Sequence, residues 1–363
     1  MRHIGLFLLA ALMGLGQRQL FAQQLRPGFD AQEYIRLLEV CNRQIDTPWK
    51  MNDKMLPEPE GCRLVYRSPT TGLDNRWDLW LQGDSVGIIS IRGSIGREES
   101  WLENFYCAMV PATGILQLND STVFHYKLAE DFKACVHLGW LIGMASLAPT
   151  VVEKVREYRQ KGIRAFIIMG HSQGGSIAFL LRSYLYYLDK SLPGGDDLVV
   201  KTYCSAASKP GNQYYSYDFD YITRGGWGLR VVNTRDWVPE APFSIQTLRD
   251  MNPVNPFAKE SIFSKIYLGS DYKELDDAST QAETTYQMDL GHKVYLKMKK
   301  FLPELVEPKY EPTTAFIPAG VTVVLPPYSG YDQAFVGSAL AVMVHHGLRA
   351  YYELVRHDYG VGQ

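Results

Sequence analysis

The sequence lacks metal-binding cysteine motifs, strongly charged blocks and internal repeats, which are features that often indicate a function. Its 363 residues include only five cysteines and no Cys-x-x-Cys pair, so their spacing supports no zinc site, and no other metal cluster is visible. The formal net charge is −2 and no block of Lys or Arg stands out. Nucleic acid and a strongly anionic membrane surface are therefore poor candidate partners. The chain has no internal repeat, and its length fits one large domain with a smaller appendage.

Apolar runs long enough to span a membrane comfortably are also lacking. The run Ile4–Leu15 follows a short polar start at Arg2 and His3, and a small residue, Ala22, comes soon after it. This pattern is typical of a secretory signal peptide cleaved after Ala22, and an uncleaved membrane anchor is the alternative. We therefore expect export to the periplasm or the extracellular space, with no integral membrane span in the mature chain.

The five cysteines leave their redox state open. Export permits disulfides, and Cys41 and Cys62 are the closest pair in the sequence. The alternative is that all five are small, buried apolar residues. Their positions are 41, 62, 107, 135 and 204.

Hydrophobic patterning predicts alternating strands and helices. Residues 30–44 have helical periodicity, with Asp30 as the expected N-cap. Apolar or alternating stretches predict strands at 63–67, 77–82, 86–91, 165–169, 198–204, 229–233 and 321–325. Further helices are expected over 132–160 and 173–189, near 290–304, and at the C-terminal end as far as Val355. Apolar strands alternating with helices predict an α/β fold in which a mostly parallel sheet carries helices on both faces.

The motif Gly170-His171-Ser172-Gln173-Gly174 fits G-x-S-x-G and is the strongest chemical signal. It follows an apolar strand directly and precedes a predicted helix, which is the strand–turn–helix frame that a nucleophilic serine needs. Ser172 is thus the candidate nucleophile. The backbone N–H of Gln173, at the helix N-terminus, would face a tetrahedral oxyanion. A serine hydroxyl also needs a base and an acid that orients the base, expected in the order Ser, Asp or Glu, His.

Four blocks of sequence carry a resemblance to a known family. In order they are Ile91–Ser94 with Trp101–Asn104, Val136–Trp140, the GHSQGG stretch at 170–175, and Ser208–Asn212 with Asn233–Pro239. Together they resemble the lipase class 3 family, the fungal-lipase-like branch of the α/β hydrolases, and in particular a secreted bacterial-type member. The similarity covers about residues 77–242, with a weaker tail to 355. It implies an α/β-hydrolase domain over 61–363, behind a signal peptide at 1–22 and an N-terminal helical extension at 23–60.

The resemblance also implies roles for individual residues. Ser94 matches the residue that supplies an oxyanion-hole donor, and His137 matches a structural histidine. Asp236 matches the triad acid, and it falls just past the predicted strand 229–233, at the carboxyl end of the sheet. Asp218 and Asp220 compete with it on spacing, but neither follows a predicted strand.

The base is a choice among several histidines. His292 lies 56 residues after Asp236, as in compact fungal members, but begins an apparent helix. His346 follows the predicted strand 321–325 and has Tyr351 five residues on, which resembles larger bacterial and diacylglycerol-lipase-like members. We favour His346, then His345, then His292, and expect His357 to be solvated. One continuous helix over 334–355 would instead place His346 on a helix face.

These features predict a serine hydrolase that cleaves carboxylic esters, acylglycerol lipids above all, without a cofactor. A phospholipase A1 or an acyltransferase would use the same triad, and a peptidase is a lesser alternative. A binding protein with a relict hydrolase fold is the alternative outside catalysis. The resemblance implies a lid after Ser94, where residues 95–100 are short and polar, while the more apolar residues 105–116 are an alternative lid.

Overall fold

The computed structural model describes residues 25–44, 56–190, 198–252, 254–255, 271–335 and 341–361. The predicted signal peptide lies outside these residues. The five cysteines lie within them and are free, so Cys41 and Cys62 form no disulfide here.

A seven-stranded sheet forms the centre of the molecule, in the order β1-β2-β3-β8-β9-β10-β11. Neighbours from β3 to β11 pair in parallel, whereas β2 is antiparallel to both β1 and β3. The predicted α/β-hydrolase fold with a mostly parallel sheet is therefore confirmed. Its strands are β1 Cys62–Arg67, β2 Trp77–Gln82, β3 Val86–Ile91, β8 Ala165–His171, β9 Val199–Ser205, β10 Gly228–Asn233 and β11 Val321–Leu325.

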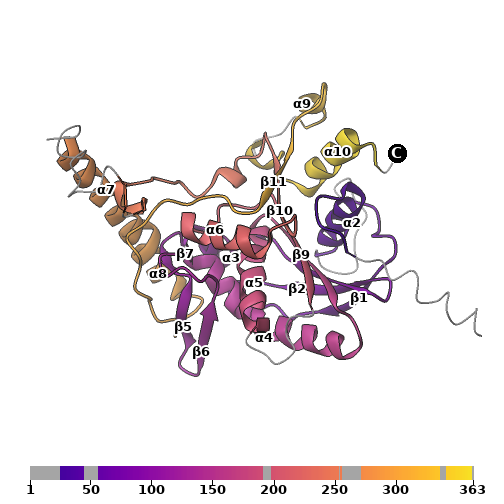
Figure 1. Ribbon diagram of the computed structural model, residues 1–363, viewed down its shortest axis with the longest axis horizontal. Coiled ribbons are helices and arrows are strands. Elements are labelled where there is room, and N and C mark those ends of the chain that lie inside the picture. Colours follow the sequence, from indigo (N-terminus) through magenta and orange to yellow (C-terminus); the bar gives the residue numbers. More distant parts are fainter. Residues whose placement is uncertain are drawn as a thin grey trace, which may run out of the picture.

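Helices cover both faces of this sheet (Figure 1). On one face lie α4 (Leu138–Gln160) and α5 (Gln173–Lys190), which bury a large apolar cluster against β3, β8 and β9. On the other face α2 (Ala31–Asn42) and α10 (Leu348–Tyr359) lie side by side over a second apolar cluster. The side chain of Asp30 caps α2 by accepting a hydrogen bond from the Glu33 N–H, as predicted. The N-terminal helix is thus one layer of the main body.

Helix α4 is the one helix among the described residues that is long and apolar enough to cross a membrane by length and composition. Most of its apolar residues are buried against the sheet and α5, so its hydropathy is that of a core helix.

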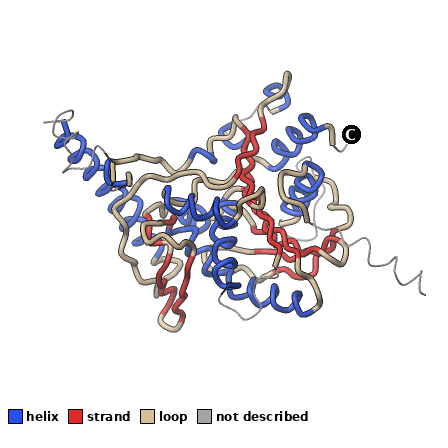
Figure 2. Tube along the Cα trace, in the orientation of Figure 1, coloured by secondary structure: helices blue, strands red, loops and turns tan. Residues whose placement is uncertain are grey.

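The remaining elements lie around this frame (Figure 2). Two small antiparallel pairs join β4 (Met109–Pro111) to β7 (Cys135–His137) and β5 (Thr113–Asn119) to β6 (Thr122–Lys127). The β5–β6 hairpin and α7 project from the body. The other helices are α3 Glu98–Phe105, α6 Gln213–Ile222, α7 Asp271–Gln287, α8 Lys293–Met298 and α9 Tyr331–Ala334.

Most predicted strand positions are confirmed, whereas several helix boundaries differ. The strands at 77–82, 86–91 and 321–325 are observed as predicted. The helix expected from residue 132 begins at Leu138, because residues 135–137 pair with β4. The helix expected over 290–304 is a π-helical turn at Met288–His292 followed by α8, which ends at Met298. Helices α3, α6 and α7 and the two small strand pairs were not predicted.

Candidate active site

Ser172 occupies a strained turn between β8 and α5. Its φ is +63°, a left-handed backbone conformation that residues other than glycine rarely adopt. The flanking glycines make this turn possible. A Cβ at Gly170 would lie 2.0 Å from the Gly174 carbonyl oxygen, and one at Gly174 would lie 2.3 Å from the Ile91 oxygen. The predicted strand–turn–helix frame around Ser172 is therefore present.

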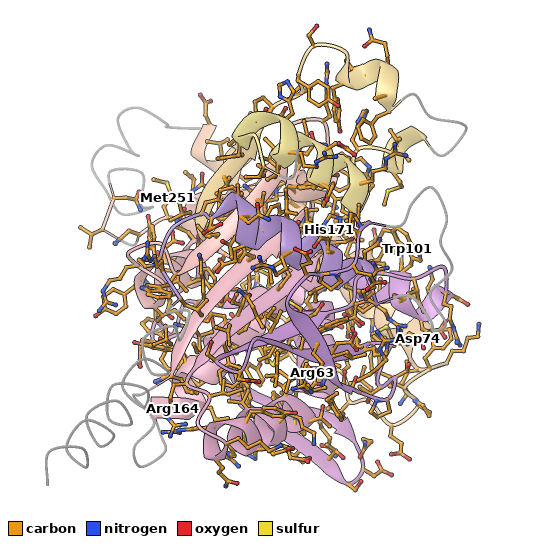
Figure 3. The ribbon with its side chains drawn as sticks, turned by 90° about the vertical axis from the view of Figure 1, so that its right-hand side faces the viewer. Arg63, Asp74, Trp101, Arg164, His171 and Met251 are labelled. Atoms are coloured by element: carbon orange, nitrogen blue, oxygen red, sulfur yellow. The ribbon has the colours of Figure 1, made fainter. Side chains whose placement is uncertain are left out.

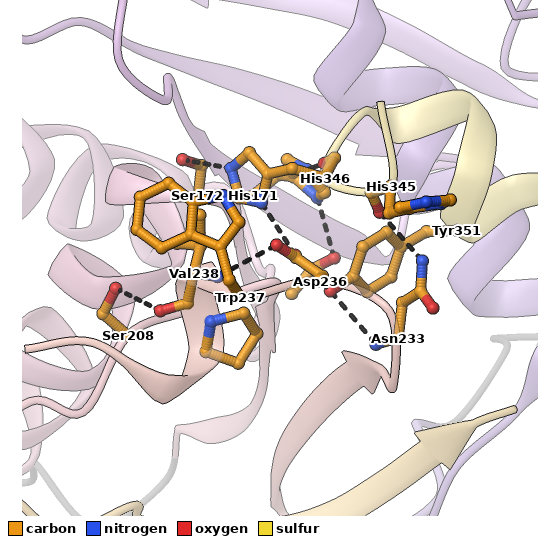
Figure 4. Close-up of polar contacts among 12 residues, drawn as sticks. His171, Ser172, Ser208, Asn233, Asp236, Trp237, Val238, His345, His346 and Tyr351 are labelled. Atoms are coloured by element: carbon orange, nitrogen blue, oxygen red, sulfur yellow. Dashed lines mark hydrogen bonds and ion pairs between the residues drawn. The ribbon is translucent and has the colours of Figure 1, made fainter. Parts of the chain in front are cut away.

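Ser172, His346 and Asp236 form a continuous hydrogen-bonded row (Figure 4). Ser172 Oγ lies 2.7 Å from His346 Nε2, and His346 Nδ1 lies 2.8 Å from Asp236 Oδ2. Because a carboxylate only accepts, Nδ1 carries the ring proton, which leaves Nε2 free to accept the serine proton. The three residues come from the ends of β8 and β10 and from the turn before α10, so the fold unites positions up to 174 residues apart.

Asp236 is buried and receives further hydrogen bonds. The backbone N–H of Val238 donates to its Oδ1 at 3.0 Å, and the Tyr351 hydroxyl donates to its Oδ2 at 2.7 Å. Tyr351 in turn accepts from the Asn233 N–H at 3.1 Å. Burial and the nearby Asp236 carboxylate raise the pKa of Tyr351 well above its usual value, so it stays a donor. These contacts fix the carboxylate and the imidazole against rotation.

The rival candidates lie elsewhere. His345 Nδ1 is 3.2 Å from the Tyr331 hydroxyl, and His292 Nδ1 is 3.1 Å from Glu307. His357 is exposed and contacts Asp358. Of the rival acids, Asp218 accepts from the Tyr187 hydroxyl and Asp220 from the Gly320 N–H. None of these hydrogen bonds joins a rival to Ser172.

His346 lies in a turn outside any helix. Its N–H donates to the Met343 carbonyl at 3.2 Å, and α10 begins only at Leu348, after an extended Gly347. A continuous helix over 334–355 is therefore wrong, since α9 ends at Ala334. The turn directs the imidazole toward Ser172.

A buried histidine that the sequence analysis left unassigned holds this turn in place. His171 Nε2 donates to the His346 carbonyl oxygen at 2.7 Å, and its Nδ1 accepts from the Ser205 hydroxyl at 2.9 Å. Ser205 Oγ is 2.6 Å from the Tyr34 hydroxyl on α2. Burial and the neighbouring His346 lower the pKa of His171 to about 3, so its ring is neutral. The N-terminal helix is thus connected to the candidate base.

On the other side of Ser172, a second hydrogen-bonded group holds Ser94. Asn104 Nδ2 donates to Ser94 Oγ at 2.8 Å, and Asn104 Oδ1 accepts from the Trp140 indole at 3.0 Å. His137 Nε2 donates to the Asn104 carbonyl at 3.3 Å, while its ring stacks on Trp140 at 3.6 Å between centroids. Burial lowers the pKa of His137 to about 3. These contacts are structural, and they orient Ser94.

Gln173 is the first residue of α5, so its N–H is among the helix donors that have no partner within the helix. Its side chain is buried and tied to α3: Nε2 donates to the Ser100 carbonyl at 3.1 Å, and Oε1 accepts from the Ser100 hydroxyl at 3.3 Å. Helix α3 therefore supports both predicted oxyanion donors, through Ser100 and Asn104.

A cavity of about 490 Å³ opens above Ser172 and His346. Figure 3 shows Trp101 and His171, which both line this cavity, on the same side of the molecule. Much of the remaining wall is apolar, from Ile95, Met343 and Leu348. Within the described ranges, no group of three or more His, Cys, Asp or Glu side chains could hold a metal ion.

The two candidate lid segments differ in burial. Residues 96–98 are exposed, and Glu98 begins α3. Tyr106 and Val110 are each no more than 1% exposed and belong to the main core, and Met109 is paired with β7. Residues 105–116 are therefore mainly buried, which favours residues 95–100 as the lid segment.

One family model matches part of the chain. Residues 88–246, a little under half of the chain, match the model of the lipase (class 3) family. The matched range contains Ser94, Ser172, Gln173 and Asp236, while His346 lies 100 residues beyond it. The family match supports a lipase-like carboxylic ester hydrolase. No curated protein matches the chain.

Several solved lipase structures are similar to the chain at low identity. A triacylglycerol lipase from Penicillium expansum is 15% identical over 59% of this chain and 74% of its own, with a TM-score of 0.41. Lip2 lipase from Yarrowia lipolytica is 16% identical over 61% and 78%, with a TM-score of 0.40. Rhizomucor miehei triacylglyceride lipase is 21% identical over 50% and 62%, with a TM-score of 0.36.

Proposed function

We propose that the chain is a serine hydrolase that cleaves carboxylic esters of acylglycerol lipids through a Ser172–His346–Asp236 triad and an acyl-enzyme. One observation carries the proposal: the unbroken row from Ser172 Oγ through the His346 ring to Asp236, with contacts of 2.7 and 2.8 Å. A serine hydroxyl is a weak nucleophile until a base at hydrogen-bond distance takes its proton, and His346 Nε2 lies at that distance.

Acylation would begin when Ser172 Oγ attacks the ester carbonyl carbon and its proton passes to His346 Nε2. The imidazolium formed there lies against Asp236, whose negative charge stabilises it. The tetrahedral intermediate then collapses, the carbon–oxygen bond to the alcohol breaks, and His346 returns its proton to the leaving alkoxide. The alcohol departs and the acyl group stays on Ser172.

The negative charge of the tetrahedral oxygen would be stabilised by the Gln173 N–H and the Ser94 hydroxyl. Both donors are positioned before substrate binds, through the contacts of α3 with Ser94 and with the Gln173 side chain. Donors that need no reorganisation are the usual basis of oxyanion stabilisation.

Deacylation repeats these steps with water. His346 takes a proton from the water as its oxygen attacks the acyl carbonyl, and then returns a proton to Ser172 Oγ as the acyl bond breaks. The carboxylic acid leaves, and the enzyme returns to its starting state without a cofactor.

Acylglycerol lipids are the proposed substrates on two grounds, the family match and the apolar cavity wall. A phospholipase A1 or an acyltransferase would use the same groups. Incubation with triglyceride, phospholipid and an acceptor alcohol, followed by product analysis, separates the three.

We also propose export, which predicts that the mature protein starts at Gln23 by N-terminal sequencing.

The test of the proposed chemistry is Ser172→Ala assayed on p-nitrophenyl butyrate and tributyrin. We expect the rate to fall by at least about 10⁴-fold, because the nucleophile is lost. Ser121→Ala is the matched control, since Ser121 is exposed at the tip of the β5–β6 hairpin and should keep full activity. Full activity in Ser172→Ala would overturn the proposal.

A further inference from the structure

Glu103, on α3, is a fully buried carboxyl that the proposed mechanism does not use. The residue has no exposed surface. Its Oε2 accepts from Asn75 Nδ2 at 2.6 Å, and its Oε1 has no hydrogen-bond partner among the described residues. Such a group is costly to bury as an anion, so it needs an explanation.

The position of Glu103 connects it to both oxyanion donors. It lies between Ser100, which contacts the Gln173 side chain, and Asn104, which holds Ser94. Its carboxyl is also a neighbour of the Gln173 amide itself. Glu103 is therefore next to the supports of both donors on the same helix.

Glu103 is packed closely against helix α4. A Cβ at Gly139 would lie 1.8 Å from the Glu103 carbonyl oxygen, and one at Gly143 would lie 2.4 Å from Oε1 and 3.0 Å from Ile177. Helix α4 thus has a glycine at both points of contact with Glu103, one against its backbone carbonyl and one against its carboxyl group. The carboxyl is packed against α4 and has no solvent-exposed surface, so an anion there would not be hydrated from the bulk solvent.

The basic residue nearest along the chain, Arg97, forms ion pairs with residues other than Glu103. Arg97 pairs with Asp74 at 2.8 Å and with Glu99 at 2.6 Å, and His137, the N-cap of α4, is neutral. The side chains that lower the pKa of the carboxyl are the amides of Asn75 and Gln173. The acidic, basic and histidine residues on or beside these elements are Asp74, Arg92, Arg97, Glu98, Glu99 and His137, then Glu153, Lys154, Arg156, Glu157 and Arg159 in the second half of α4, and Arg182, Asp189 and Lys190 in the second half of α5.

We propose that Glu103 is a positioning residue for the two oxyanion donors, that it acts only as a neutral carboxylic acid, and that its ionisation sets the alkaline limit of activity. Two physical consequences of ionisation support this. A carboxylate beside the start of α5 would compete with the oxyanion for the positive end of that helix. It would also be a buried charge with no cationic partner and one unpartnered oxygen among the described residues, which is costly.

The protonation state at neutral pH agrees with the geometry. Burial raises the pKa of the Glu103 carboxyl to about 8, although the hydrogen bond from Asn75 and the nearby Gln173 amide oppose the shift. The inference rests on the proposed ester hydrolysis. Loss of activity in Ser172→Ala tests that chemistry separately from Glu103.

The experiment compares kcat against pH, from 5 to 10, for the wild type, Glu103→Gln and the control Glu98→Gln. Glu98 lies on the same helix but is exposed. We expect wild type and Glu98→Gln to lose activity reversibly above about pH 8, by about tenfold per pH unit. Glu103→Gln, which stays neutral, should keep its pH 7 rate within about twofold at pH 9.5.

The inference would be overturned if kcat of Glu103→Gln fell at alkaline pH in the same way as kcat of the wild type. It would also be overturned if Glu103→Gln folded but was inactive at every pH. Asn75→Ala provides a second test that does not require Glu103→Gln to fold. It removes a hydrogen bond that favours the carboxylate, so the alkaline limb should move to higher pH. A limb that stays in place or moves down would contradict the proposal.

Discussion

Two buried histidines, one on each side of Ser172, make the same kind of contact in different settings. His171 donates Nε2–H to the backbone carbonyl of His346, the proposed base, and His137 donates Nε2–H to the carbonyl of Asn104, which holds Ser94. In both, burial lowers the pKa to about 3, so each ring is a neutral, fixed donor. Each half of the site is thus held by a histidine that takes no proton from substrate.

The two halves differ in where their supports come from. The oxyanion half is local, since Ser94, Asn104, His137 and Trp140 lie within 47 residues of one another. The base half is assembled from distant parts: His171 contacts a carbonyl 175 residues away, and Ser205 contacts Tyr34 across 171 residues. The support of Ser94 therefore comes from one short segment, whereas the support of His346 comes from distant parts of the chain.

The largest expected effect separates two adjacent residues of the base half. His346→Ala should lower kcat by about 10⁵- to 10⁶-fold, because the general base is lost. His345→Ala should stay within about threefold of the wild type, since its backbone carbonyl still accepts from Asn233. Steady-state kinetics on a soluble ester measures both. An equal loss of kcat in His346→Ala and His345→Ala would show that His346 is not the general base.

The oxyanion half should show an intermediate effect. Ser94→Ala removes one proposed donor and should lower kcat by about 10²- to 10³-fold, with little change in KM. Ser94→Thr keeps the hydroxyl and should recover most of the rate. If Ser94→Ala is fully active, the stabilising donors lie elsewhere.

A smaller effect is expected at Tyr351. Tyr351→Phe deletes a hydrogen bond to the Asp236 carboxylate while the Val238 N–H and His346 still hold that group. We expect about a tenfold loss of kcat, typical of one bond to a charged acceptor. Tyr352→Phe is the neighbouring control, because that hydroxyl contacts Glu39. No difference between the two variants would show that Tyr351 does not support the triad.

The last prediction concerns His137 and the pH dependence of stability, and we expect it to involve the smallest change in activity. His137 is neutral in the folded protein down to about pH 3, whereas in the unfolded chain it takes up a proton below about pH 6.5. Its contribution to the free energy of unfolding is therefore complete above pH 6.5. It falls by about 1.4 kcal/mol for each pH unit below that value.

Urea unfolding at pH 7.5, 5.5 and 4.5 tests this contribution. His137→Asn, which cannot titrate, should lose less stability between pH 7.5 and 4.5 than the wild type. His357→Asn is a control, because His357 is exposed. A pH slope in His137→Asn as steep as in the wild type would contradict the neutral, buried state of His137.

The contrast between the halves also explains what the sequence could predict. Strands at 77–82 and 86–91 and the turn at Ser172 follow from local patterns, and the blocks that hold Ser94 and His137 are close together in sequence. The turn at His346 could not be derived in the same way, because its direction is set by His171, Ser205 and Tyr34, which have no sequence signal in common. Helix α3 was missed because its polar start, Glu98–Ser100, has the composition of a loop.

The most direct test of the central claim is labelling with a fluorophosphonate, which reacts only with an activated serine. We predict stoichiometric modification of the wild type at Ser172, located by peptide mass spectrometry, and more than about a thousandfold slower modification of His346→Ala. Asp236→Asn should react at an intermediate rate. An unmodified Ser172 in the folded wild type, or equal labelling rates in the wild type and His346→Ala, would contradict the account.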